Sequence, residues 1–157
     1  MSVYFDASII IAGLLSPDGG STLLLKLVKK QIIVGITSQT VIDEILDKKE
    51  KILRSKTYIE GFILINNLIV RKRLLRSEIK NCPTVVDQND AHVVVGAQKT
   101  HCTHLVTLDK KHLLRADVKY AFKPLKILTP GEMLEELALD TSENRADSSI
   151  LVIAKRP

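Results

Sequence analysis

The sequence predicts an α/β fold: a single three-layer domain in which helices cover both faces of a mostly parallel five-stranded sheet. Two observations predict it. Short stretches rich in Val, Ile and Leu alternate with longer amphipathic stretches, and 157 residues, 45% of them hydrophobic, suffice for one core. The domain is expected over residues 1–139, and residues 140–157 are expected to form a C-terminal tail that is mobile or pairs as an edge strand.

The first part of the chain shows strand and helix patterns in alternation. Ser2 to Asp6 is short and rich in Val and aromatic residues, which predicts a buried strand, and the apolar stretch after it predicts a helix. The turn at Pro17 to Gly20 separates this helix from a second one, which Ser21 would cap. A second strand is expected over Gln31 to Ile36, followed by an amphipathic helix capped at Thr37-Ser38.

The second part continues the alternation. A helical pattern runs from Lys48 to Asn67, and Leu68 to Arg73 is the expected third strand. After a break at Pro83, Asp87 is expected to open a helix in spite of its run of valines. The remaining elements are a strand over His104 to Thr107, a short helix over Lys110 to Leu114, a strand over Leu125 to Leu128 and a last helix that is capped at Thr129 and ends near Leu139.

Composition narrows the function classes. The chain has 23 Lys and Arg against 18 Asp and Glu, a net charge of +5, which weakly favours an anionic partner. Aromatic residues make up 4% and Trp is absent, which disfavours recognition by stacked aromatic platforms. Cys82 and Cys102 form neither a CxxC motif nor a disulfide scaffold, and the apolar stretches are too short to span a bilayer. We therefore expect a cytoplasmic protein without a membrane association.

Acidic residues fall near the ends of the predicted strands. Asp6 ends the first strand, and Asp109 follows directly on the fourth. Glu44 lies in the helix after the second strand, while Asp87 and Asp90 lie in the first turn of the helix before the fourth. Because parallel strands carry their carboxyl ends at one edge of the sheet, we expect these acids to meet there.

Each acid also has a structural explanation. Asp87 would serve as a helix N-cap, with Asp90 at the capping-box position. Asp6 would start a turn through its side chain, and Asp109 would cap the short helix that follows it. The argument for a site is therefore collective.

The choice between Asp43 and Glu44 stays open at this point, because both border the apolar stripe of their helix. No comparable arrangement of Lys or Arg lies nearby in sequence to neutralise the acids. Two carboxylates about 4 Å apart repel by roughly 4 kcal/mol at an effective dielectric near 20, so such a cleft needs a cation or protonation. Oxygen ligands of this kind suit Mg²⁺ or Mn²⁺, which polarise phosphoryl oxygens and orient a hydroxide for attack.

Four short motifs carry a family resemblance. In order they are Asp6-Ala7-Ser8, Thr40-Val41-Ile42-Asp43-Glu44-Ile45, Asp87-Gln88-Asn89-Asp90-Ala91-His92 and Leu105-Val106-Thr107-Leu108-Asp109. In this order and on these elements, from about Met1 to Leu139, the chain resembles the PIN-domain family of metal-dependent ribonucleases, and among them the VapC-like toxins. It departs from related sequences in its tail and at Gln88-Asn89, where Pro-Asp is common.

The resemblance implies roles for individual residues. Asp6, Glu44, Asp90 and Asp109 would be the catalytic and metal-binding acids for Mg²⁺ or Mn²⁺, so the resemblance selects Glu44. It adds Asp87 as an accessory metal-binding acid, and Ser8 and Thr107 as supporting hydroxyl groups.

The implied function is hydrolysis of RNA phosphodiester bonds by the toxin of a toxin–antitoxin pair. The expected partners are RNA, an antitoxin protein and a second copy of the chain in a homodimer. Arg71 and Arg73, in a basic run, would bind RNA phosphates unless they are simply solvated surface. His92 and His112 flank the acidic motifs without a partner nucleophile and are assigned no catalytic role.

Two other function classes are weighed against this one. The first is a PIN-like domain that has lost catalysis and binds RNA or protein. The second is a phosphatase with Asp6 as the nucleophile, but that chemistry prefers a second acid two residues on, where Ser8 stands.

Overall fold

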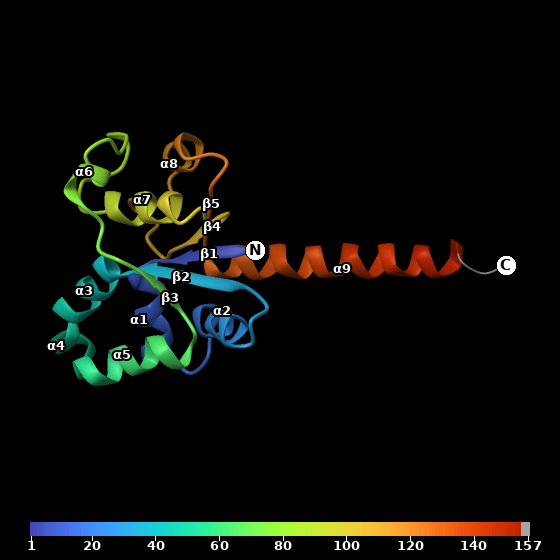
Figure 1. Cartoon of the computed structure of the whole chain (residues 1–157), viewed down its shortest axis with the longest axis horizontal. Helices are drawn as coiled ribbons and strands as arrows, with labels where there is room; N and C mark the ends of the chain where they lie inside the picture. Colours follow the sequence, from blue (N-terminus) through green and yellow to red (C-terminus); the bar gives the residue numbers. More distant parts are fainter. Residues whose placement is uncertain (155–157) are drawn as a thin grey trace.

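The computed structural model describes the backbone of residues 1–154 and the side chains of residues 1–142. Within this part of the chain, five strands form one parallel sheet in the order β3-β2-β1-β4-β5. Helices lie on both faces of the sheet (Figure 1), which confirms the predicted three-layer α/β fold. The strands are β1 (Ser2–Phe5), β2 (Val34–Ser38), β3 (Ile69–Arg71), β4 (His104–Val106) and β5 (Lys126–Leu128).

The helices divide between the two faces of the sheet. In Figure 1, α1, α2 and α5 lie on one side of the strands, and α7 and α8 lie on the other. The helices are α1 (Ala7–Leu15), α2 (Gly20–Lys29), α3 (Gln39–Asp47), α4 (Lys49–Ile52), α5 (Lys56–Ile65), α6 (Arg76–Ile79), α7 (Ala91–Lys99), α8 (Ala116–Ala121) and α9 (Pro130–Ala154).

Strand β1 forms the centre of the core. Val3, Tyr4 and Phe5 are fully buried, as expected of a central strand covered by helices on both faces. The ring of Tyr4 packs directly against Gly96 of α7, where an added methyl group would lie 2.3 Å from the tyrosine hydroxyl oxygen. The absence of a side chain at Gly96 therefore lets α7 approach the sheet closely.

The direction of chain progression reverses beside β1. From β1 the chain moves outward through β2 to β3, and it then returns to the other side of β1 to form β4 and β5. Tyr4 pairs with Ile36 of β2, and Phe5 pairs with Val106 of β4. In an open parallel sheet, the carboxyl ends of the strands at such a reversal form a crevice suited to ligands.

Two predicted helix starts have different outcomes. Ser38 caps α3 as predicted, because its hydroxyl accepts a hydrogen bond from the Val41 amide. The predicted cap at Ser21 is wrong: the N-cap is Gly19, whose φ of 123° suits a residue without a side chain. Strand β2 also begins later than predicted, at Val34.

The long helical pattern over residues 48–67 is interrupted. Leu53, with φ of 56°, ends α4, and Ser55 caps α5 by accepting a hydrogen bond from the Tyr58 amide. The short helix predicted over Lys110 to Leu114 is wrong, since these residues form turns and the next helix, α8, begins at Ala116.

The last helix is longer than predicted. It begins as expected, since Thr129 and Glu132 form reciprocal hydrogen bonds at its start. Its backbone continues to Ala154 and extends away from the rest of the domain (Figure 1), so the end near Leu139 and the edge strand over 150–153 are wrong. Thr141 and Ser142 lie within this helix, and their hydroxyls donate to the carbonyls of Leu137 and Leu139.

Two expectations about this end of the chain stay predictions: the domain boundary at Leu139 and the mobility of residues 140–157, of which residues 155–157 lie outside the described chain. Among the described residues, no single helix is both long and apolar enough to cross a bilayer. Helices α1 and α2 together have that length and apolar composition, but they are bent by 97° relative to each other.

Candidate metal centre

The acids predicted to meet do line one cleft. A cavity of about 460 Å³ lies beyond the carboxyl ends of β1 and β4, at the reversal point of the sheet. Its lining includes four of the five predicted acids: Asp6, Glu44, Asp90 and Asp109. Asp6 and Asp90 are the N-cap residues of α1 and α7, Glu44 lies within α3, and Asp109 follows β4.

Asp6 is buried at the base of this cleft, with 7% of its surface exposed. It is the N-cap of α1, and its Oδ1 accepts a hydrogen bond of 2.7 Å from the Ala7 amide. Its Oδ2 accepts hydrogen bonds from the hydroxyls of Ser8 (2.8 Å) and Thr107 (2.7 Å). Burial raises the pKa of Asp6 more than these hydrogen bonds lower it, so the carboxylate would gain from a nearby cation.

Ser8 and Thr107 connect the two strand ends. Besides holding Asp6, the Ser8 hydroxyl oxygen accepts from the Leu108 amide (3.1 Å), and the Thr107 hydroxyl oxygen accepts from the Asp109 amide (3.0 Å). These are the two residues predicted to support the acids, and their placement next to Asp6 fits that role.

Asp109 faces a turn of its own chain. Its Oδ1 accepts hydrogen bonds from the amides of Lys111 (3.0 Å) and His112 (2.9 Å), so it does cap a turn, although not a helix. Its Oδ2 lies 3.0 Å from Nδ1 of His112. Burial raises the pKa of Asp109, but the hydrogen bonds from His112 outweigh that effect and the pKa is lowered.

Glu44 is the most strongly compensated acid of the cleft. Its Oε1 lies 2.6 Å from Nζ of Lys48, one turn further along α3, and its Oε2 lies 3.4 Å from Nε2 of His92. The contact with His92 and the ion pair with Lys48 lower the pKa of Glu44 to about 2. The expectation that no lysine would neutralise the acids is therefore wrong at this position.

The neighbouring acid, Asp43, lies outside the cleft lining. Its two carboxylate oxygens accept from Nε (2.6 Å) and Nη2 (3.1 Å) of Arg73. This bidentate pair, which lowers the pKa of Asp43, gives that acid a structural role. The geometry thus places Glu44 rather than Asp43 with the other acids.

Asp90 and Asp87 differ although they are one turn apart. Asp90 holds the N-cap position of α7, but its side chain makes no capping hydrogen bond and lines the cleft instead. Burial and the charge of Asp109 raise its pKa. Asp87 is not among the described residues that line the cleft, and its Oδ1 accepts from the Asn89 amide (2.9 Å) in a local turn. A metal-binding role for Asp87 stays a prediction.

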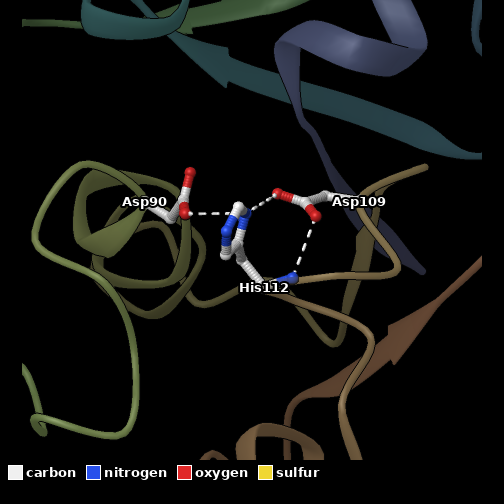
Figure 2. Close-up of side chains that lie close together, drawn as sticks. All are labelled: Asp90, Asp109 and His112. Atoms are coloured by element: carbon white, nitrogen blue, oxygen red, sulfur yellow. Dashed lines mark hydrogen bonds and ion pairs between the residues drawn. The ribbon is translucent and has the colours of Figure 1, made fainter.

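One histidine that was assigned no role from the sequence lies beside these acids. Asp90, Asp109 and His112 converge in Figure 2, and each offers a ligand atom within 4.8 Å of the others. The spacing Asp109-x-x-His112 is a local signal that pointed to this contact, because residues three apart in a turn face each other.

The predicted phosphate-binding arginines are both engaged within the protein. Arg71 forms an ion pair with Glu78, and Arg73 forms the bidentate pair with Asp43. RNA binding by these two arginines stays a prediction.

A larger cavity lies elsewhere and carries no comparable chemistry. It measures about 590 Å³ between β2, β3 and α5, and its described lining consists of uncharged residues such as Val28, Leu64 and Ile69. It offers no carboxylate or imidazole, so the smaller acidic cleft is the better candidate for a metal centre.

The donor set of the acidic cleft fits a divalent cation. Asp6 and Asp90 have raised pKa values, which shows that the cleft disfavours their uncompensated charges. Within residues 1–142, neither acid forms an ion pair with Lys or Arg. Carboxylate oxygens gathered in this way are the ligands that Mg²⁺ and Mn²⁺ accept.

An open parallel sheet with an acidic cleft at its reversal point defines the class: a small α/β protein with a candidate metal centre. A family model described as "PIN domain" matches residues 2–111. Because the match covers more than half of the chain, the chain belongs to the PIN-domain family.

A solved structure shares the fold. It is a chain from the "Crystal structure of VapBC2 from Rickettsia felis bound to a DNA fragment from their promoter", matched with a TM-score of 0.55 and 17% sequence identity. The match covers 82% of this chain and 98% of that chain. At this identity, the likeness concerns the fold. No curated protein matches the chain.

Proposed function

We propose that this protein is a Mg²⁺- or Mn²⁺-dependent endoribonuclease that hydrolyses RNA phosphodiester bonds. One observation carries the proposal: Asp6, Glu44, Asp90 and Asp109, in a chain of the PIN-domain family, line a single cleft. The net charge of +5 is consistent with an anionic substrate.

The cleft residues would divide the work as follows. Asp6, Glu44, Asp90 and Asp109 would hold the ion, which when bound polarises a phosphoryl oxygen and activates water. Ser8 and Thr107 fix the orientation of Asp6 through their hydrogen bonds. Lys48 adds a positive charge to the cleft wall and would attract the phosphate backbone.

The aspartyl-phosphatase alternative is less well supported. Asp6, its nucleophile, already accepts three hydrogen bonds. Ser8 stands two residues on, where this chemistry prefers an acid, and its hydroxyl donates to Asp6. We therefore favour attack by water over attack by a carboxylate.

We further propose that the chain is the toxin of a toxin–antitoxin pair. The support is its PIN-domain family and the shared fold with a chain of a VapBC2 structure. In this proposal an antitoxin protein, encoded by a small neighbouring reading frame, would restrain the nuclease. The homodimer and the cytoplasmic location stay predictions.

The test compares Asp6, which lines the cleft, with Asp43, which lies outside its lining and pairs with Arg73. We expect the parent to cleave a fluorescently labelled single-stranded RNA in Mn²⁺ or Mg²⁺, and to stop doing so in EDTA. Asp6→Asn should lower the rate by about 100-fold or more, because it removes a negative ligand from the cation. Asp43→Asn, which changes an acid outside the cleft, should retain the rate within about threefold.

The same variants test the toxin proposal in cells. Expression of the parent and of Asp43→Asn should arrest growth, and expression of Asp6→Asn should not. Co-expression of the neighbouring small protein should restore growth. Equal cleavage by Asp6→Asn and the parent would exclude Asp6 from the site, and an inactive parent would favour a binding domain without catalysis.

A further inference from the structure

We propose that His112 is a nitrogen ligand of the metal centre, and that it makes the centre prefer Mn²⁺ over Mg²⁺. The inference rests on the proposed metal-dependent function and adds a ligand and a metal preference to it. The cluster that carries it consists of Asp90, Asp109 and His112 (Figure 2).

The distances in this cluster fit ligands of one ion. Nδ1 of His112 lies 3.0 Å from Oδ2 of Asp109 and 3.6 Å from Oδ2 of Asp90. In an octahedral site with metal–ligand bonds of about 2.1 Å, adjacent ligand atoms lie roughly 3 Å apart. Small shifts of the Asp90 and His112 side chains would therefore place Oδ2 of Asp90, Oδ2 of Asp109 and Nδ1 of His112 around one cation.

The atoms that converge are those that the fold leaves available. Backbone amides of Lys111 and His112 occupy Oδ1 of Asp109, which directs Oδ2 of the same carboxylate towards the imidazole. The Asp90 side chain makes no capping hydrogen bond to α7, so its oxygens are not needed to complete that helix. The backbone amide of His112 donates to Asp109, which fixes the distance between these two residues.

The half-exposed imidazole of His112 can exchange its contact with Asp109 for a bond to the metal ion. Its side chain is 40% exposed, so it is not locked in place by packing. Without an ion, Nδ1 lies within hydrogen-bonding distance of Asp109. On metal binding, the unprotonated Nδ1 would bind the cation in place of that hydrogen bond.

The mixed donor set sets the metal preference. Mg²⁺ is a hard ion that takes oxygen ligands and keeps its waters, whereas imidazole nitrogen favours first-row transition ions. Both ions would bind the two carboxylates. The imidazole nitrogen would add more to the affinity for Mn²⁺ than to the affinity for Mg²⁺. Removing the imidazole should lower the affinity for Mn²⁺ more than that for Mg²⁺.

The experiment measures both affinities by calorimetry on the full chain, without RNA. We expect His112→Ala to lower the Mn²⁺ affinity by about tenfold, with a change of less than about threefold for Mg²⁺. His101→Asn is the matched control, because it removes an exposed histidine remote from the acids, and Asn tolerates the φ of 53° at that position. The control should leave both affinities unchanged.

A spectroscopic readout separates ligation from positioning. Mn²⁺ bound to the parent should show electron spin echo modulation from a directly bonded nitrogen. His112→Gln, which retains a hydrogen-bond donor for Asp109, should lose this signal while circular dichroism confirms its folding, and His101→Asn should keep it. A signal that survives in His112→Gln, as it would if His92 supplied it, overturns the inference.

The remaining outcomes distinguish the two proposals. If the parent binds Mn²⁺ and Mg²⁺, and both affinities fall equally in His112→Ala, the inference fails and the proposed nuclease stands. If the parent binds neither ion, both proposals fail.

Discussion

At the scale of single residues, the acids of the cleft differ in how their charges are compensated. Glu44 faces Lys48 and His92, and its pKa is lowered to about 2. Asp90 faces the like charge of Asp109 in a partly buried setting, and its pKa is raised. Without a metal ion, therefore, Asp90 destabilises the fold whereas Glu44 is stabilised in its charged form.

This difference predicts the effect of Asp90→Asn on stability. In EDTA at pH 7, the variant should melt at a higher temperature than the parent, because it relieves carboxylate repulsion. Each kcal/mol relieved corresponds to roughly 2 to 4 °C for a chain of this size. Millimolar Mn²⁺ should raise the melting temperature of the parent by mass action and have a much smaller effect on the variant.

Differential scanning fluorimetry with and without Mn²⁺ checks this prediction, with Asp43→Asn as the control. The control should lower the melting temperature, because it breaks the pair with Arg73, and should keep the Mn²⁺ response. A parent whose melting temperature is the same in EDTA and in Mn²⁺ contradicts the metal-centre hypothesis.

At the scale of elements, two helical glycines have opposite surroundings. Gly96 of α7 lies against Tyr4 of β1, and an added Cβ would lie 2.3 Å from the tyrosine hydroxyl oxygen. Around Gly61 of α5, such a Cβ would have no described heavy atom within 4 Å apart from Gly61 itself, its two chain neighbours and the nearby backbone of its own helix. The first glycine is required by packing, whereas the second only lowers the helix propensity.

Alanine substitutions at these positions should therefore act in opposite directions. Gly96→Ala should lower the free energy of unfolding by about 1 to 3 kcal/mol, because α7 or Tyr4 must move. Gly61→Ala should raise it by about 0.5 to 1 kcal/mol, because alanine favours the helix. Urea denaturation measures both, and a stabilised Gly96→Ala variant would show that α7 does not pack as closely as described.

At the scale of the whole molecule, an ion pair and a hydrogen bond connect the last helix to the sheet. Glu136 of α9 lies 2.5 Å from Nζ of Lys126 on β5 and 2.9 Å from Nε2 of His104 on β4. The hydrogen bonds from Lys126 and His104 lower the pKa of Glu136. Because the folded pKa lies below the unfolded one, this contribution to stability is complete at neutral pH and is lost as the pH falls through the lowered value.

Glu136→Gln should therefore make the unfolding free energy less sensitive to acid. Between pH 6 and pH 3, the parent should lose more stability than the variant, by up to about 1 kcal/mol, since the pair with Lys126 is partly exposed. Urea denaturation across this pH range provides the measurement. Glu135→Gln, at a neighbouring position without an ion pair in the described chain, is the control and should follow the parent.

The sequence by itself determined the alternation of strands and helices, the parallel sheet and the edge at which the acids gather. These features are local or follow from general rules: buried strands are short and apolar, and parallel strands end at one edge. The positions of Asp6, directly after β1, and of Asp109, shortly after β4, were therefore predictable.

Only the tertiary structure decided which charged groups meet across the fold. It paired Asp43 with Arg73 and Glu44 with His92, which separated these two acids, and it brought His112 to Asp90. It also extended α9 beyond Leu139, so that the Ser and Thr residues taken to indicate a tail lie within the helix. Sequence periodicity describes one element at a time, whereas the partners of a side chain depend on how several elements pack together.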